Sequence, residues 1–154
     1  MSFSFGSDEY FMHQAYQQAL LAESDHEIPV GAVVVCNNKI VAKAYNQTEK
    51  LNDVTAHAEM LALTSAFNYF GAKYLPDCTI YITLEPCTMC AGALFWSQIG
   101  KVVYGAADKK RGYSLLEVNN DNKLLHPKTK LTTGIFAAEC GELVTIFFKK
   151  LRQK

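Results

Sequence analysis

The amino-acid sequence predicts an α/β fold, a three-layer α/β/α sandwich with a mixed central sheet. Short runs rich in β-branched residues alternate with longer segments of helical periodicity, which is the pattern of such layered folds. Two of the strand-like runs are separated only by Asn37-Asn38, a dipeptide that favours a hairpin turn. The 154 residues contain no repeat or linker-like stretch, so we expect one domain over residues 1–154.

The first half of the chain is predicted to form a helix, a hairpin and a second helix. Residues 8–24 predict an amphipathic helix, because the apolar side chains of one face recur at helical spacing. Those side chains belong to Phe11, Ala15, Ala19 and Leu20. After Pro29, VGAVVVC and IVAKAYN predict the two hairpin strands. Residues 55–70 predict the next helix, with Asp53 or Thr55 as its N-cap.

The second half alternates strands and helices. CTIYITLE, residues 78–85, predicts a buried strand, and Pro86 suits the first position of a helix that runs through CTMCAGALFWS. KVVYGA predicts a further strand at residues 101–106. Residues 107–130 are polar and are expected to be irregular, and residues 134–151 predict a final helix.

Composition narrows the class of protein. The five cysteines are an odd number and the N-terminal residues do not resemble a secretion signal, so we expect reduced cysteines and a cytoplasmic location. No apolar run is long enough to cross a bilayer, so we expect no membrane partner. The 15 basic and 15 acidic residues give a net charge of zero. This counts mildly against nucleic-acid binding, because proteins that bind nucleic acids usually carry an excess of basic residues.

Two short segments, His57-Ala58-Glu59 and the run from Pro86 to Cys90, carry candidate chemistry. Cysteines three residues apart on a helix share one face, and the positive end of the helix dipole favours the thiolates that zinc requires. Together with His57 they make a His/Cys/Cys set, which leaves the fourth tetrahedral position open to water, as in catalytic zinc sites. Glu59 could then serve as general base and acid beside that water.

Other interpretations of these segments are weighed against the catalytic one. A lone CxxC also occurs as a redox pair or as half of a structural zinc site. A structural site needs a fourth ligand, for which Cys78, His126 and Cys140 are the candidates, but none has a ligand-like spacing. We therefore favour a catalytic zinc site.

The combination of H-x-E with P-C-x-x-C resembles the signature of the cytidine and deoxycytidylate deaminase superfamily. Within it the chain is most similar to the bacterial tRNA adenosine deaminases, over IPVGAVVV, NDVTAHAEM, YITLEPCTMCAGAL, IGKVVYGA and the final helix. The resemblance implies a cytidine-deaminase-like fold and a homodimer. It also implies hydrolytic conversion of adenosine to inosine at the wobble position of the tRNA anticodon loop.

The resemblance also implies a role for individual residues. His57, Cys87 and Cys90 would hold one zinc ion per chain, and Glu59 would move protons. The implied substrate-binding residues are Asn46, which would hydrogen-bond the purine, and Ala58, Glu85 and Pro86, which would line the pocket. Val54 and Gln98 depart from the family, which commonly has proline and arginine there.

Two groups of residues are candidate RNA contacts. Phe147, Phe148 and Lys149 bring an aromatic pair and positive charge to the final helix, and Lys110 and Arg111 lie in the polar segment of residues 107–130. Phe95 and Trp96 are expected in the core or in a dimer contact.

Two rival functions share these motifs. A deaminase of a free base such as guanine or cytosine would use the same catalytic residues without a phosphate-binding surface. A non-enzymatic zinc-stabilised RNA-binding module would need a fourth protein ligand and no role for Glu59.

Overall fold

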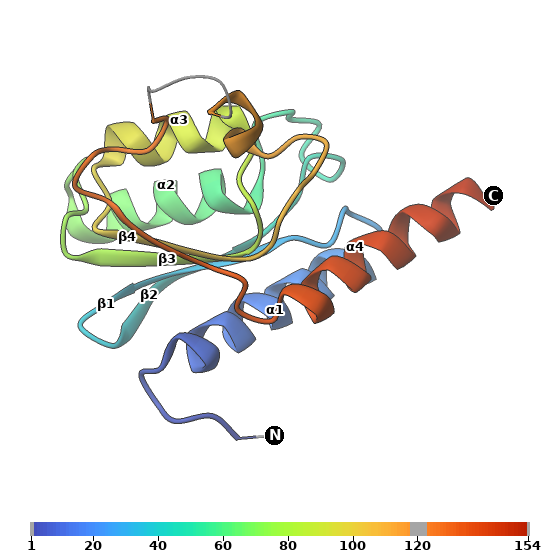
Figure 1. Ribbon diagram of the computed structural model, residues 1–154, viewed down its shortest axis with the longest axis horizontal. Coiled ribbons are helices and arrows are strands. Elements are labelled where there is room, and N and C mark those ends of the chain that lie inside the picture. The colour runs from blue at the N-terminus through green and yellow to red at the C-terminus, as the bar shows by residue number, and fades with distance from the viewer. Residues whose placement is uncertain (1, 118–122, 154) are drawn as a thin grey trace.

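The computed structural model describes residues 2–117 and 123–153, which form a five-stranded sheet between two layers of helices. Helices α1 and α4 cover one face of the sheet, and α2 and α3 cover the other (Figure 1). The elements are α1 (Asp8–Ser24), β1 (Gly31–Cys36), β2 (Lys39–Tyr45), α2 (Ala58–Phe70), β3 (Cys78–Leu84), α3 (Thr88–Ser97), β4 (Lys101–Ala106), the 3-10 helix η1 (Tyr113–Leu116), β5 (Lys130–Thr133) and α4 (Ala137–Arg152). The predicted three-layer α/β/α architecture is confirmed.

The sheet is mixed, as the sequence predicts. Its order is β2-β1-β3-β4-β5, with β1 antiparallel to both β2 and β3, and with β3, β4 and β5 parallel to one another. The hairpin turn between β1 and β2 holds Asn37 and Asn38 at φ of 52° and 61°. Positive φ at both central residues is what a two-residue hairpin turn requires, and asparagine tolerates it.

Helix α1 packs closely on β1 through a glycine. A Cβ atom at Gly31 would lie 2.1 Å from the carbonyl oxygen of Ala15, so only glycine allows this approach. The buried stripe of α1 includes the predicted Phe11, Ala15 and Ala19, together with Met12 and Ala22. The prediction for Leu20 was wrong, because it is 40% exposed and lies at the margin of the buried face.

Several predicted element boundaries were wrong. Helix α2 begins at Ala58 and has His57 as its N-cap, because the Asp53 carboxylate instead accepts the N–H and hydroxyl of Thr55 in the preceding turn. Helix α3 has Cys87 as its N-cap, so Pro86 lies one residue before the cap. Helix α4 begins three residues later than predicted, at Ala137.

The segment of residues 107–130 is more regular than its polar sequence predicts. It contains η1, and it ends in the first residue of β5, which adds a short edge strand to β4. Residues 118–122, within the predicted loop, lie outside the described residues. Across residues 2–117 and 123–153, no helix combines the length and apolar character needed to cross a membrane.

Candidate metal centre

The metal centre is assembled at the beginnings of two neighbouring helices. His57 is the N-cap of α2, Cys87 is the N-cap of α3, and Cys90 lies in the first turn of α3. Strand β3 ends at Leu84, three residues before Cys87, so the sheet fixes where α3 starts. The helix dipoles place partial positive charge at the N-termini of both α2 and α3, which favours anionic sulfur there.

The three donor atoms lie at distances that suit one zinc ion. The Nδ1 atom of His57 is 3.7 Å from the Cys87 sulfur and 3.5 Å from the Cys90 sulfur. A tetrahedral zinc with bonds of about 2.0 Å to nitrogen and about 2.3 Å to sulfur would place these atoms about 3.5 Å apart. Within the described part of the chain, this group contains His57, Cys87 and Cys90 and no fourth His, Cys, Asp or Glu.

The residues considered as a fourth ligand lie elsewhere. Cys78 begins β3, at the end of the strand opposite to Leu84. Cys140 lies in α4 close to Gly105, and His126 packs its ring against Phe95. The donor set is therefore a three-ligand set, and a closed structural site with one of these residues does not fit the geometry.

The pKa shifts of His57, Cys87 and Cys90 are coupled through their hydrogen bonds, and they favour a cation between the three side chains. The hydrogen bond from Cys90, followed by that from His57, lowers the pKa of Cys87 to about 3. The pKa of Cys90 is raised, first by its hydrogen bond to Cys87 and then by burial. The hydrogen bond with Cys87 raises the pKa of His57. A divalent cation supplies the charge that allows both thiols to ionise.

Glu59 lies beside the ligands without joining them. It is in the first turn of α2, it is 3% exposed, and its carboxyl group hydrogen-bonds the Cys90 thiol. Burial raises the pKa of its carboxyl group. Its position next to the donor set suits a group that takes up and releases a proton.

A cavity of about 1090 Å³ opens over these residues. Its floor is formed by His57, Ala58, Glu59 and Cys87, at the two helix starts. The other lining residues come from five segments: Ile28 and Val30; Asn46 and Thr48; Leu84, Glu85, Thr88 and Met89; Ala107, Asp108, Lys109, Lys110 and Arg111; and Gly141, Val144, Thr145, Phe148 and Arg152. The floor thus carries the reactive groups, and loops and α4 supply the walls.

Asn46 is held rigidly in one wall. Its amide nitrogen donates to the carbonyl oxygen of Ile28 at 3.2 Å, and its amide oxygen accepts the N–H of Thr48 at 3.3 Å. A primary amide has two N–H groups and two acceptor positions, so one of each remains for a ligand. Thr48, which sequence analysis missed, lines the same wall.

The side chain of Glu85 faces a loop rather than the metal centre. It is 4% exposed, and its carboxylate accepts the N–H groups of Asp108 and Ser114, each at 3.0 Å, and the Ser114 hydroxyl at 2.6 Å. The Pro86 carbonyl accepts the N–H of Tyr113, and Pro86 is not among the described residues that line the cavity. Both residues therefore hold the segment that carries Lys110 and Arg111.

A second buried carboxylate holds the opposite loop. Glu27 accepts the N–H groups of Glu49 and Lys50 at 3.0 and 2.7 Å. This anchors the loop that follows Asn46. Sequence analysis missed this role because the partners are more than 20 residues away from Glu27.

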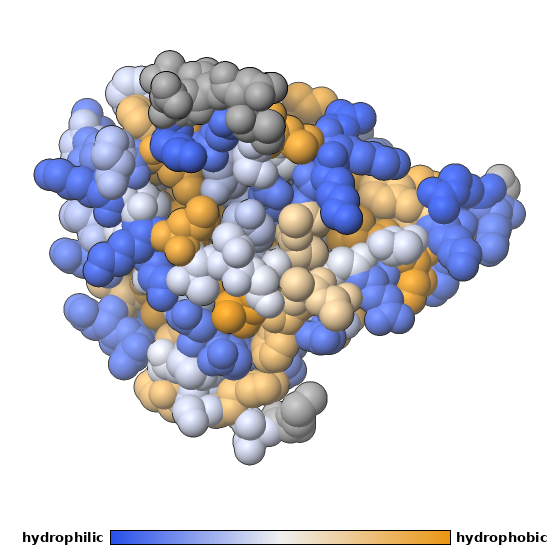
Figure 2. Space-filling view, viewed as in Figure 1, coloured by the Kyte–Doolittle hydropathy of each residue, from blue (hydrophilic) through white to orange (hydrophobic). Residues whose placement is uncertain are grey.

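The candidate RNA contacts divide into two sets. Lys110, Arg111 and Phe148 line the cavity, whereas Phe147 and Lys149 are not among its described lining residues. Val144, Phe148 and Arg152 recur every four residues, so they share one face of α4, and this periodicity could have identified them. The end of α4 projects from the body and is hydrophilic (Figures 1 and 2).

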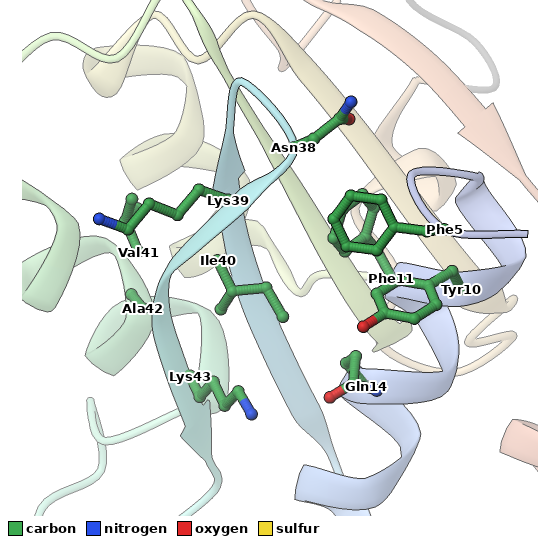
Figure 3. Close-up of a pocket in the computed structure, with 10 residues that line it drawn as sticks. All are labelled: Phe5, Tyr10, Phe11, Gln14, Asn38, Lys39, Ile40, Val41, Ala42 and Lys43. Atoms are coloured by element: carbon green, nitrogen blue, oxygen red, sulfur yellow. The ribbon is translucent and has the colours of Figure 1, made fainter.

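A second cavity, of about 660 Å³, lies between α1 and the edge strand β2 (Figure 3). Aromatic Phe5 and Tyr10 flank it on one side, and Lys39 and Lys43 on the other. Its described lining contains no histidine, cysteine or carboxylate. It therefore lacks the side chains that most often hold a metal ion.

Comparison with known proteins places the chain among nucleobase deaminases. The family model for the cytidine and deoxycytidylate deaminase zinc-binding region matches residues 6–106. The tRNA-specific adenosine deaminase of Bacillus subtilis is 41% identical over 96% of this chain and 92% of its own length. A structure from studies of A-to-I editing by tRNA:A34 deaminases at the wobble position is 36% identical, with a TM-score of 0.81, and covers 87% of this chain and 98% of that one.

A guanine deaminase structure from Bacillus subtilis matches less of the molecule. It is 33% identical, with a TM-score of 0.66, and covers 76% of this chain and 78% of that one. The fold is therefore shared with free-base deaminases, but the tRNA:A34 deaminase covers more of both chains.

Proposed function

This chain belongs to the tRNA-specific adenosine deaminases within the cytidine and deoxycytidylate deaminase family, and we infer that it converts adenosine to inosine at the wobble position of tRNA. The observation that carries this inference is the set of His57, Cys87 and Cys90 at the floor of a cavity, with the buried Glu59 beside it. One zinc ion per chain is proposed from that donor set.

Glu59 is proposed to carry the protons of the reaction. When bound, zinc supplies the Lewis acidity that allows water to ionise near neutral pH. The Glu59 carboxylate takes the proton of that water and delivers it to a ring nitrogen of the adenine. As the water oxygen adds to the carbon that bears the amine, Glu59 takes the remaining proton of that oxygen and passes it to the amine, which departs as ammonia. Adenosine and water thus become inosine and ammonia.

The walls of the cavity would hold the nucleotide in place. The free N–H and acceptor position of Asn46 can hydrogen-bond the purine, while the backbone at Ala58 and Glu85 lines the space around it. We assign these as substrate-binding residues. The base must leave its stack to reach the floor, which costs least in a single-stranded anticodon loop.

The cationic rim of the cavity supports RNA rather than a free base as the substrate. Lys109, Lys110 and Arg111 lie on one wall and Arg152 on another. Phosphates need positive charge at the cavity mouth, whereas a free base has no charge for it to bind. The overall charge of zero does not oppose this, because these four basic side chains line one cavity.

A homodimer is proposed together with this function. Large apolar side chains remain exposed on the α3 side of the molecule, among them Trp96, which is 75% exposed, and Leu115 and Leu116 of η1. Such side chains suit a subunit contact, and the exposure of Trp96 excludes the core and leaves the dimer contact, the other alternative expected for it. We also propose that the protein acts in the cytoplasm, where it would meet its tRNA substrate. Light scattering of the zinc-loaded protein gives its mass directly, and a monomer at all concentrations would refute the dimer.

The test is deamination of an anticodon stem-loop with adenosine at the wobble position, beside free guanine, cytosine and adenosine. Inosine in the RNA and no turnover of free bases is expected. Turnover of a free base alone would refute the RNA substrate. Glu59→Gln should keep zinc and lose turnover by roughly 10²–10⁴-fold, whereas the exposed control Glu9→Gln should keep both. Loss of zinc from Glu59→Gln would contradict the proton-transfer role.

A further inference from the structure

Two cysteines that the deaminase reaction does not use face each other at the end of the sheet away from the metal centre. Cys36 is the last residue of β1, Cys78 is the first of β3, and the antiparallel register pairs them directly. Strand β3 advances about 3.3 Å per residue, so Cys78 lies about 20 Å from Leu84, near the metal centre.

Cys36 and Cys78 occupy a non-hydrogen-bonded position of the antiparallel ladder, where the backbone groups of the two paired residues do not bond each other. The N–H of Gly31 donates to Thr83 Oγ1 on β3, so residues 31, 33 and 35 direct their N–H groups to β3, and Cys36 directs its own away. The N–H of Cys78 donates to the carbonyl oxygen of Leu75 instead of to β1. In such pairs the Cα atoms are about 4.5 Å apart, within the roughly 4.4–6.8 Å that a disulfide spans.

The two side chains also point the same way, because directly paired residues of neighbouring strands lie on the same face of a sheet. Cys78 belongs to the core cluster that α2 and α3 cover, and Cys36 packs against that cluster. Cys36 is half-buried, whereas Cys78 is 3% exposed, so an external reagent meets the Cys36 sulfur first. Burial, and then the neighbouring Cys36, raises the pKa of Cys78 to about 12.

We propose that Cys36 and Cys78 form a reversible disulfide across β1 and β3 when the protein meets a disulfide oxidant such as oxidised glutathione. The Cys36 thiolate attacks one glutathione sulfur, and one glutathione thiolate leaves. The Cys78 sulfur then attacks the Cys36 sulfur and displaces the second glutathione. The two cysteines lose two electrons to the glutathione disulfide, and their two protons pass to the two glutathione thiolates.

The crosslink would stabilise the fold without touching the catalytic groups. It closes a long loop of the unfolded chain that contains β2 and α2, and so lowers the entropy of the unfolded state. A rise in Tm of roughly 5–15 °C is expected for a chain of this length. The metal ligands lie at the other end of β3, so the zinc content should not change.

The test uses zinc-loaded protein incubated with oxidised glutathione, alkylated, and digested without reduction. A linked Cys36–Cys78 peptide, retained zinc, and a Tm rise that dithiothreitol reverses are expected. The control Cys140→Ala, which removes another buried thiol, should behave in the same way. Cys36→Ser, a nearly isosteric change at a half-buried position, should give neither the linked peptide nor the Tm rise.

Three results would overturn the proposal. The first is a glutathione adduct on Cys36 without the linked peptide. The second is a disulfide that includes Cys87 or Cys90 and forms with loss of zinc. The third is an equal rise in Tm in the Cys36→Ser variant.

Discussion

Replacing Glu85 with alanine should loosen the loop of residues 107–114 and weaken RNA binding while leaving the zinc in place. The Glu85 carboxylate accepts two backbone N–H groups and one hydroxyl. Without it, the N–H groups of Asp108 and Ser114 lose their acceptor in a buried setting, at about 1–3 kcal/mol each. Water entering the vacated space offsets part of this, so we expect a loss of about 2–3 kcal/mol in unfolding free energy.

The assay for Glu85→Ala has a stability arm and a kinetic arm. A loss of that size corresponds to a fall in Tm of roughly 4–12 °C. Lys110 and Arg111 follow Asp108 in the loop, so KM for the stem-loop should rise more than kcat falls. The control Ser114→Ala removes only the hydroxyl bond and should cost about 0.5–1.5 kcal/mol. A fall in kcat with unchanged KM and unchanged Tm would refute the reasoning.

Three further changes test other parts of the structure. Cys87→Ala should abolish zinc binding, measured by metal analysis, and lower Tm, because metal binding is coupled to folding; full zinc occupancy would contradict the ligand assignment. Gly31→Ala should cost about 3 kcal/mol or more in urea unfolding, since its Cβ would meet the Ala15 backbone, whereas Gly92→Ala, whose Cβ meets open space in the described structure, should not destabilise. Lys110→Ala with Arg111→Ala should reduce the slope of log KM against log salt by about 1.4–1.8; an unchanged slope would remove both from the RNA surface.

The cluster of His57, Cys87 and Cys90 could be predicted because its signals are local. Cys87 and Cys90 are three residues apart, a spacing that helix geometry converts into a shared face, and Glu59 follows His57 by two residues at the start of the other helix. The alternation of strands and helices likewise predicted the layered fold. Each of these inferences needs only a short stretch of sequence.

The parts that could not be predicted depend on distant partners. Glu85 binds amides 23 and 29 residues away, and Glu27 binds amides 22 and 23 residues away, so no local pattern marks them. Strand β5 is short and polar, and its pairing with β4 defines it. The N-cap of α2 was predicted at the wrong residue because the Asp53 carboxylate accepts hydrogen bonds from the N–H and hydroxyl of Thr55, and none from the helix.

The order of the functional segments along the chain has a consequence for how specificity can change. The proposed zinc ligands and Glu59 all precede Ala106, where the match to the family model ends. The cationic loop and the α4 face that line the cavity follow it. Substitution or exchange of the last third of the chain can therefore redirect which molecule is accepted while the ligands and Glu59 stay as they are. An evolutionary lineage, or a protein engineer, can vary substrate choice there with the reaction already in place.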